Sequence, residues 1–317
     1  MLAGLKTCAT HFLGKASFAT TVTMFFLILM NILWGASYTV LKWGMEYCAP
    51  MHLLFFRLVL STVILLIFSY GHFVKMPRAD FLRCVALGAI IAVAHSLGVI
   101  GIEKSHATDG AILYAMEPIM AIVFARILLK EKMTIWGLIS LSLALAGFLI
   151  LSNVTAGGIL TNMTLIGNAI MLLGIFADGL FSPVAKPVVE KYPARIVLTI
   201  AIVFTTLFVA PLALFTPLAP RTFSMPTLVS VLYLSVICTC VGWTMWLFFL
   251  KRFPVNVIAL TVFIQPIVGP FVSYFTIGEQ VGARIWFGGI IILIGVLIAV
   301  FKRKKSETEI IAEAVIH

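Results

Sequence analysis

The chain has 317 residues, of which 62% are hydrophobic and only 11% are charged, whereas roughly 25% of the residues in an ordinary soluble domain are charged. This apolar fraction excludes a water-soluble fold, and the formal charge of +10 is better explained by the basic loops that orient membrane proteins than by a nucleic-acid surface. The five cysteines are scattered and form no CxxC pair, so neither a disulfide framework nor a metal site is expected, and no cofactor is expected either.

Ten apolar runs follow one another along the chain, each near the ~20 residues that a membrane-spanning helix needs. They lack strand-type alternation, and short connections marked by Pro or Gly separate them. We therefore expect an all-α membrane protein with transmembrane helices over residues 22–43, 51–70, 82–102, 108–129, 134–152, 163–186, 195–216, 227–250, 255–277 and 283–301. The first run continues past the small residues near Gly35, which predicts a retained helix rather than a cleaved signal peptide.

The basic residues predict how these helices are oriented. If the N-terminus lies inside, the inner segments hold 17 of the 22 Lys and Arg residues and the outer segments hold four. Cytoplasmic loops carry the excess of Lys and Arg, so both termini are expected in the cytoplasm. The expected location is the inner membrane of a bacterial cell, where the lipid bilayer surrounds a monomer or a homodimer.

The second half of the chain repeats features of the first half in the same order. The matching pairs are Ala111 and Ala259, Pro118 and Pro266, Glu131 and Glu279, and Gly147 and Gly295 at a shift of 148 residues, and Lys42 and Lys186, and Glu46 and Glu190, at a shift of 144. Each half then holds five helices. Because five is an odd number, the second half crosses the membrane in the opposite sense, which makes an inverted repeat. Such repeats bind substrate between them near the membrane midplane and expose it to each side in turn.

This repetition predicts the organisation of the chain. The expected segments are a cytoplasmic N-terminal segment over residues 1–21, a first five-helix repeat over 22–152, an external linker over 153–162, a second five-helix repeat over 163–301 and a cytoplasmic tail over 302–317.

Several short motifs stand at regular places in the two halves. They are Leu33-Trp34-Gly35, Pro50 followed by Arg57, and the pairs Glu117-Pro118 and Gln265-Pro266, each followed by Glu131 or Glu279. With these motifs the chain resembles, over residues 22–301, the EamA-type members of the drug/metabolite transporter superfamily. It departs from the pattern at Ala177-Asp178-Gly179, where Leu-Trp-Gly is typical of the family.

The resemblance implies a ten-helix exporter or exchanger of small organic metabolites, with a central cavity lined by both halves. Within this family, some intracellular bacteria use such carriers to exchange S-adenosylmethionine for S-adenosylhomocysteine, and the resemblance makes that exchange one specific expectation.

Ionisable side chains within the predicted helices are the first candidates for a binding site, because a charge at membrane depth is costly and usually faces a cavity or the bundle interior. These residues are Arg57, His95, Glu117 and Asp178. Structural roles are open for each of them. Glu117 could form a local polar contact beside the proline that follows it, and His95 could be a core residue. Asp178 could instead pair with Lys186 or Arg57.

Polar and aromatic side chains on helix faces complete the candidate substrate site. On the first helix Asn31, Trp34, Tyr38 and Lys42 form a stripe, and such a face is not expected to point at lipid. In the eighth helix Thr239, Trp243 and Trp246 show similar spacing. The other candidates share a face or a proline kink with the residues above: Tyr114, Phe181 and Gln265.

A second group of charged residues is expected to serve gating or structure: Lys42, Arg57, Glu131, Lys186 and Glu279. Pro118 and Pro266 are expected to kink their helices, because proline cannot donate the backbone hydrogen bond of a regular helix.

Two buried carboxylates among aromatic rings favour a cationic or zwitterionic cargo, since aromatic faces attract onium groups. Amino acids, aromatic amines and sulfonium metabolites fit this description. We expect a secondary transporter, coupled to a proton or to a counter-substrate. A channel and a lipid-metabolite flippase are the alternatives. The sequence contains no HExxH, GxSxG or Walker motif, so an enzyme is not expected, and no nucleic-acid partner is expected.

Overall fold

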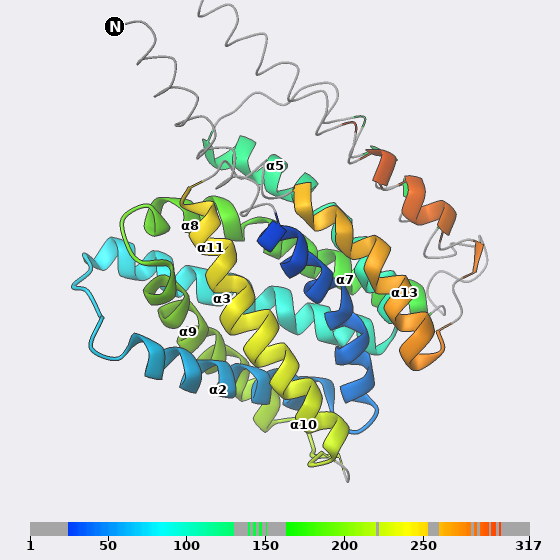
Figure 1. Ribbon diagram of the computed structural model, residues 1–317, viewed down its shortest axis with the longest axis horizontal. Coiled ribbons are helices and arrows are strands. Elements are labelled where there is room, and N and C mark those ends of the chain that lie inside the picture. The colour runs from blue at the N-terminus through cyan, green and yellow to red at the C-terminus, as the bar shows by residue number, and fades with distance from the viewer. Residues whose placement is uncertain are drawn as a thin grey trace, which may run out of the picture.

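The computed structural model describes residues 25–129, 163–219, 222–252 and 260–279, together with shorter stretches between residues 139 and 150 and between 282 and 298. Within these residues the protein is all-helical and contains no strand. Six of the helices there are long and apolar enough to cross a membrane. The expected all-α fold of membrane-spanning helices is therefore confirmed, and Figure 1 shows the helices gathered into one bundle.

The helices follow the expected runs closely. Their bounds are Phe25–Met45 for the first helix, Pro50–Ser69 for α2, Arg78–Glu103 for α3, Ala107–Leu113 for α4, Tyr114–Met116 for η1, Glu117–Leu129 for α5, Met163–Gly179 for α7, Phe181–Val189 for α8, Ala194–Leu214 for α9, Met225–Leu232 for α10, Tyr233–Trp243 for η2, Thr244–Leu250 for α11, Leu260–Ile264 for η3 and Gln265–Ile277 for α13. Residues 286–291 are also helical. The expected helix over 134–152 and the tail over 302–317 lie largely or wholly outside the described residues.

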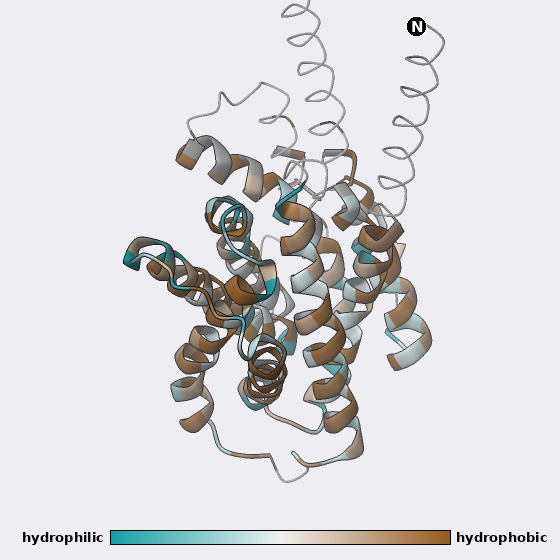
Figure 2. Cartoon of the chain, turned by 60° about the vertical axis from the view of Figure 1, so that its left-hand side comes forward, coloured by the Kyte–Doolittle hydropathy of each residue, from teal (hydrophilic) through white to brown (hydrophobic). Residues whose placement is uncertain are grey.

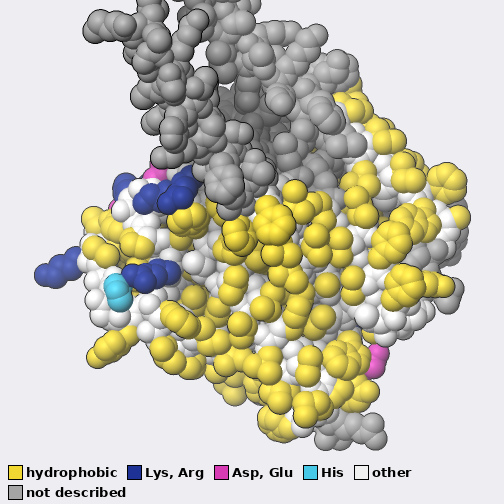
Figure 3. Space-filling view, viewed as in Figure 1, with side chains coloured by type: hydrophobic (Ala, Val, Ile, Leu, Met, Phe, Trp, Pro, Cys, Tyr) yellow, Lys and Arg dark blue, Asp and Glu magenta, His cyan; other side chains and the backbone are white. Residues whose placement is uncertain are grey.

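The surface of the bundle is apolar, as a bilayer solvent requires. Figure 2 shows brown, hydrophobic residues along most of the length of the helices. In Figure 3 hydrophobic side chains cover most of the visible described surface, and the Lys and Arg side chains seen there gather at one edge. Large apolar side chains such as Ile67 and Phe68 are exposed by 68% and 70%. Monomeric soluble proteins rarely expose apolar patches of this extent.

Three of the helices change their hydrogen-bond pitch along their length. Glu117 and Gln265 each begin a new α-helix directly after a 3-10 segment, and a proline follows each of them. The two prolines expected to kink their helices thus stand at a change of helix type, and neither can donate to the turn before it. The third change is η2, an 11-residue π-helix between α10 and α11.

Helices α3 and α7 touch along their backbones because glycines face one another. A Cβ atom on Gly101 would lie 2.7 Å from the carbonyl oxygen of Gly167, and one on Gly167 would lie 2.6 Å from the carbonyl oxygen of Gly101. Two turns further along α7, a Cβ on Gly174 would lie 2.8 Å from the carbonyl oxygen of Ala94. In lipid no hydrophobic force drives helices together, so close contact through small residues provides the packing energy.

Charged side chains satisfy the helix termini where α3 turns into α4. The Lys42 ammonium donates to the carbonyl oxygens of Ile102 and Ser105 at 2.8 and 2.6 Å. The Glu279 carboxylate accepts from the backbone N–H groups of Ala107 and Thr108 at 2.8 and 2.9 Å. A cation at the end of α3 and an anion at the start of α4 both match the helix dipoles, so this connection is held from two distant parts of the chain.

The α3–α7 contact generates a matched pair of glycine substitutions. Gly101→Ala should lower the stability of the protein by about 1–3 kcal/mol, the usual cost of overpacking, since its new methyl group meets the backbone of α7. Gly98→Ala is the control on the same helix, because a Cβ there has no atom within 4 Å. Thermal unfolding in detergent measures both, and equal melting temperatures would contradict the close contact.

The cap on α4 predicts a second effect on stability. Glu279→Ala removes the acceptor of the two backbone N–H groups at the start of α4. The free energy of unfolding should fall by about 0.5–2 kcal/mol, the range measured for lost helix caps. Glu46→Ala removes an exposed carboxylate near the end of the first helix and should leave the melting temperature unchanged. If the two variants melt alike, Glu279 contributes no cap.

Candidate functional site

A cavity of about 140 Å³ lies inside the bundle. A single buried water needs roughly 10–15 Å³ of such space, so the cavity has room for a small organic molecule. Its wall comes from the first helix, α2, α3, α4, η1, α5, α7, α8, η2, α11, η3 and α13. Ten of the eleven side chains expected to bind substrate line it: Trp34, Tyr38, His95, Tyr114, Glu117, Asp178, Phe181, Trp243, Trp246 and Gln265.

Asn31 is the expected substrate-binding residue that does not line the cavity. Its side chain is fully buried and donates to Thr261 Oγ1 at 2.8 Å, while its oxygen accepts from Gln265 Nε2 at 2.8 Å. Asn31 therefore holds Gln265 from behind the cavity wall. The face of the first helix that lines the cavity instead carries Trp34, Ser37, Tyr38 and Leu41.

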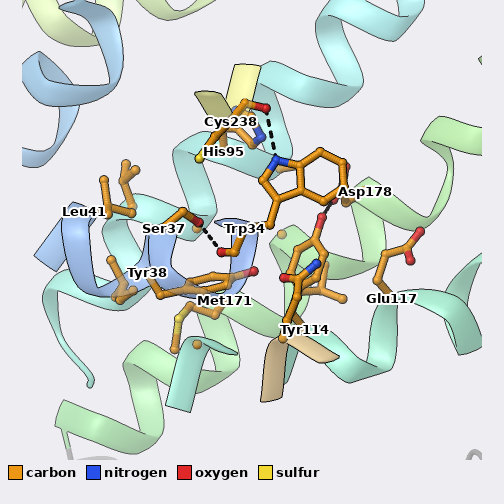
Figure 4. Close-up of a pocket in the computed structure, with 18 of the residues that line it drawn as sticks. Trp34, Ser37, Tyr38, Leu41, His95, Tyr114, Glu117, Met171, Asp178 and Cys238 are labelled. Carbon is orange, nitrogen blue, oxygen red and sulfur yellow. Dashed lines mark hydrogen bonds between the residues drawn. The ribbon is translucent and has the colours of Figure 1, made fainter. Parts of the chain in front are cut away.

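The two carboxylates of the site have different surroundings. The Tyr114 hydroxyl donates to Asp178 Oδ2, as the dashed line in Figure 4 shows. Asp178 therefore pairs with neither Lys186 nor Arg57, which were the two partners considered from the sequence. Glu117 is 6% exposed, and its carboxylate receives no hydrogen bond from the described part of the chain. One acid is thus oriented by a phenol, and the other has no such donor among the described residues.

Aromatic rings line the cavity in contacting pairs. Trp34 and Trp246 have ring centroids 5.7 Å apart, and Tyr38 and Tyr114 are 5.9 Å apart. Phe181 packs edge-on against Trp243 at 4.4 Å, and His95 meets the same indole edge-on at 5.6 Å. Edge-to-face contacts at these spacings are favourable, so the rings support one another around the space.

The polar N–H groups of two of these indoles are already used. Trp34 Nε1 donates to the carbonyl oxygen of Cys238 at 3.0 Å, which Figure 4 also shows. Trp246 Nε1 donates to Ser182 Oγ at 3.3 Å. These bonds join helices distant in sequence, and they leave only the carbon faces of the two indoles for a ligand.

The π-helix determines which residues of the eighth expected helix face the cavity. The lining positions are Leu234, Cys238, Trp243 and Trp246, and the step of five between Cys238 and Trp243 suits the wider i to i+5 turn of a π-helix. Thr239, which α-helical spacing placed on this face, instead donates to the carbonyl oxygen of Leu234 five residues back, at 2.8 Å. The Thr239 hydroxyl oxygen in turn accepts a hydrogen bond from Arg57.

Arg57 reaches the cavity from α2. Its Nε donates to Thr239 Oγ1 at 2.9 Å, and it lines the cavity together with His95. The Nδ1 atom of His95 is buried without a hydrogen-bond partner in the described part of the chain. Both residues thus line the same space.

Among the remaining expected charges, Lys42, Lys186 and Glu279 do not line the cavity. Lys186 Nζ donates to the carbonyl oxygen of Leu250 at 3.0 Å and lies 3.5 Å from the Glu190 carboxylate. Lys42 and Glu279 bind the helix termini described above. Glu131 lies outside the described residues.

Two polar clusters were not expected from the sequence. Asp80 accepts from Lys191 Nζ at 3.2 Å and from Tyr192 OH at 3.0 Å, which ties the start of α3 to the start of α9. In the sequence, the only indication of a role for Asp80 is its place in the first turn of a helix, after a proline. Its partners are more than a hundred residues away.

The second cluster lies beside the α3–α4 turn. There Asp109 is fully buried and accepts from Ser105 Oγ and Asn168 Nδ2, both at 3.1 Å. Its carboxylate also lies 3.5 Å from His106 Nδ1, and this contact raises the pKa of the His106 imidazole above its usual value. The cluster fastens the turn between α3 and α4 to α7.

Known proteins resemble this chain over most of its length. The model of the EamA-like transporter family matches residues 21–153 and again residues 160–301. An uncharacterized transporter of Archaeoglobus fulgidus is 22% identical over 89% of this chain and 99% of its own length. A probable amino-acid metabolite efflux pump of Salmonella typhimurium is 21% identical over 90% and 96%.

A probable terminal-alkyne amino-acid exporter of Streptantibioticus cattleyicolor is 22% identical over 86% of this chain and 91% of its own length. One crystal structure superposes with a TM-score of 0.65 and 13% identity, covering 90% of this chain and 99% of the other, which shows a shared fold. Since the family model matches almost all of the chain, the protein is a multi-pass integral membrane protein that belongs to the EamA-like transporter family.

Proposed function

We propose that this protein is a secondary transporter that moves a small zwitterionic or cationic metabolite, of the amino-acid and amine class, by alternating access through the central cavity. The observation that carries the proposal is the cavity itself. Ionisable and aromatic side chains gather there inside a bundle whose outer surface is apolar. Charged groups at membrane depth are costly and mark substrate or ion pathways.

The two segments matched by the family model both contribute expected binding residues to the wall. The first segment supplies Trp34, Tyr38, His95, Tyr114 and Glu117, and the second supplies Asp178, Phe181, Trp243, Trp246 and Gln265. A site between two repeats is the arrangement that alternating access needs, since movement of one half against the other opens the site to one side and closes it to the other.

Recurring contacts support the proposed inverted repeat of two five-helix halves. Lys42 donates to the carbonyl oxygen of Ile102 and Lys186 to that of Leu250, and these two contacts are related by the same shifts of 144 and 148 residues that the sequence shows. Glu117 and Gln265, also 148 residues apart, each follow a 3-10 segment. We accordingly propose ten helices, with both termini in the cytoplasm of a bacterial cell.

The relatives support the class of cargo. Two of them are described as a probable amino-acid metabolite efflux pump and a probable terminal-alkyne amino-acid exporter. An amino-acid cargo suits a wall that combines carboxylates with aromatic rings, because rings and acids both attract an ammonium group. S-adenosylmethionine, an amino acid with a sulfonium group, belongs to the same class, and its exchange for S-adenosylhomocysteine is the specific cargo proposal to be tested beside ordinary amino acids.

Neutralising either acid of the cavity should impair transport. Glu117→Gln and Asp178→Asn each remove a charged acceptor worth about 1.5–3 kcal/mol, so kcat/KM for uptake into proteoliposomes should fall roughly 10- to 100-fold. Glu103→Gln, at an exposed position near the end of α3, is the matched control and should transport normally. Normal kinetics in both cavity variants would rule out the assigned site.

The form of energy coupling is open to a direct measurement. If Glu117 or Asp178 carries a proton during transport, a pH gradient across the proteoliposome membrane should drive accumulation of the cargo. Uptake that ignores the gradient but rises with unlabelled cargo on the far side would identify an exchanger. Flux that neither saturates nor responds to far-side cargo would contradict a transporter and indicate a channel.

A further inference from the structure

Arg57 carries a charge that no described residue pairs with an opposite charge. Its side chain lines the cavity, and none of the ion pairs formed by the described residues includes it. Nε donates to Thr239 Oγ1, and the two Nη nitrogens have no acceptor among the described residues. An uncompensated charge in such a place is strongly destabilising. The guanidinium therefore does not serve the stability of the fold, and binding of an anionic group would compensate its charge.

The surrounding residues hold the backbone of Arg57 and one edge of its side chain. Its backbone carbonyl oxygen accepts from Ser61 Oγ at 2.7 Å and from Ser235 Oγ at 2.9 Å. Thr239 directs its own hydroxyl hydrogen to Leu234, which leaves a lone pair of the oxygen for Nε. The guanidinium is thus fixed at one edge, and its other edge remains open to the cavity. Fixed geometry of this kind lowers the entropic cost of binding a ligand.

The acids of the cavity line the same space as this cation but form no ion pair with it. Glu117 begins α5 and Asp178 lies near the end of α7, whereas Arg57 comes from α2 and contacts η2. The Tyr38 ring lines the same cavity and packs against Tyr114, which donates to Asp178. The cavity wall therefore carries a cation, Arg57, and two acids, Glu117 and Asp178, that are not paired with each other, and we call them its positive and negative poles.

We infer that Arg57 is the carboxylate anchor of the transporter and that its cargo is a zwitterion, with its carboxylate on the Arg57 guanidinium and its ammonium on Glu117 and Asp178. The inference rests on the proposed transport function and deepens it by naming the charged groups that the cargo must carry. Arginine suits this role because its planar fork matches the two oxygens of a carboxylate.

The two poles together determine selectivity. An amine without a carboxylate leaves the Arg57 charge unpaired inside the bundle, and an acid without an ammonium group leaves the carboxylates unpaired. A site built to pair a polar group rejects analogues that lack it far more strongly than an apolar pocket rejects a wrong shape. Arg57 is therefore the residue that distinguishes amino acids from amines.

Three matched probes test this assignment: L-phenylalanine, phenethylamine and 3-phenylpropionate, which share one ring and differ only in their charged groups. Isothermal calorimetry on the purified protein gives their affinities, and proteoliposome uptake gives their transport. For the unmodified protein we expect phenylalanine to bind roughly 10-fold or more tightly than either analogue. Arg57→Gln should weaken phenylalanine binding roughly 10- to 100-fold and leave the affinity for phenethylamine unchanged.

Arg57→Lys separates anchoring from folding. It keeps the charge without the planar fork, so phenylalanine affinity should recover in part. The affinity of each variant for phenethylamine serves as an internal measure of an intact cavity. Loss of both ligands to the same extent in Arg57→Gln, with no recovery in Arg57→Lys, would overturn the inference in favour of a structural role.

The outcomes also separate this inference from the transport proposal. If the unmodified protein transports phenethylamine but discriminates against phenylalanine, the carboxylate anchor is wrong while transport of amines stands. If the protein neither binds nor transports any of the three probes, the proposed amino-acid and amine cargo fails together with the anchor.

Discussion

The contact between α3 and α7 sets the geometry on which the cavity depends. Glycines allow the two backbones to meet at Gly101 and Gly167, in a solvent that supplies no hydrophobic force between helices. Gly174 belongs to the same contact, since it meets the α3 backbone at Ala94, and it also lines the cavity without placing a side chain in it. Tight packing and open volume therefore have one cause in this part of the bundle, and a larger residue would disturb both.

The charged side chains of the protein fall into two groups with different physical roles. Lys42, Lys186 and Glu279 complete the hydrogen bonds of helix ends, where the peptide dipoles already favour them. Arg57 and Glu117 have no oppositely charged partner among the described residues, although they lie deeper in the bundle. The first group stabilises the protein without a ligand. The second group costs free energy until something neutralises it, which is why the site is best understood together with its cargo.

Much of the site was predictable because helix geometry is local. Trp34 and Tyr38 share a face at a step of four, and a rare acid such as Glu117 or Asp178 stands out in any apolar run. The sequence misplaced side chains whose orientation depends on residues far away in the chain. Asn31 fits the same stripe as Trp34, yet Thr261 and Gln265 draw its side chain out of the cavity from 230 or more residues away.

The π-helix is the clearest feature that the sequence did not predict. No residue pattern distinguishes an i to i+5 turn from an α-helical one, so regular spacing placed Thr239 on the cavity face in place of Cys238. The partner of Arg57 was hidden for the same reason, since Thr239 lies 182 residues away in the chain. The two polar clusters around Asp80 and Asp109 likewise depend on residues that only the tertiary fold brings together.

The two indoles whose N–H groups are bonded within the protein have a consequence for breadth of recognition. Trp34 and Trp246 offer a ligand only carbon surface, and such a surface tells one apolar side chain from another by size alone, at roughly 10- to 200-fold for a methylene-sized misfit. A polar head group is recognised far more stringently than that. Substitutions that resize this apolar wall can therefore broaden or narrow the range of cargo side chains that the protein accepts. They leave unchanged the charged poles that bind the part common to every cargo.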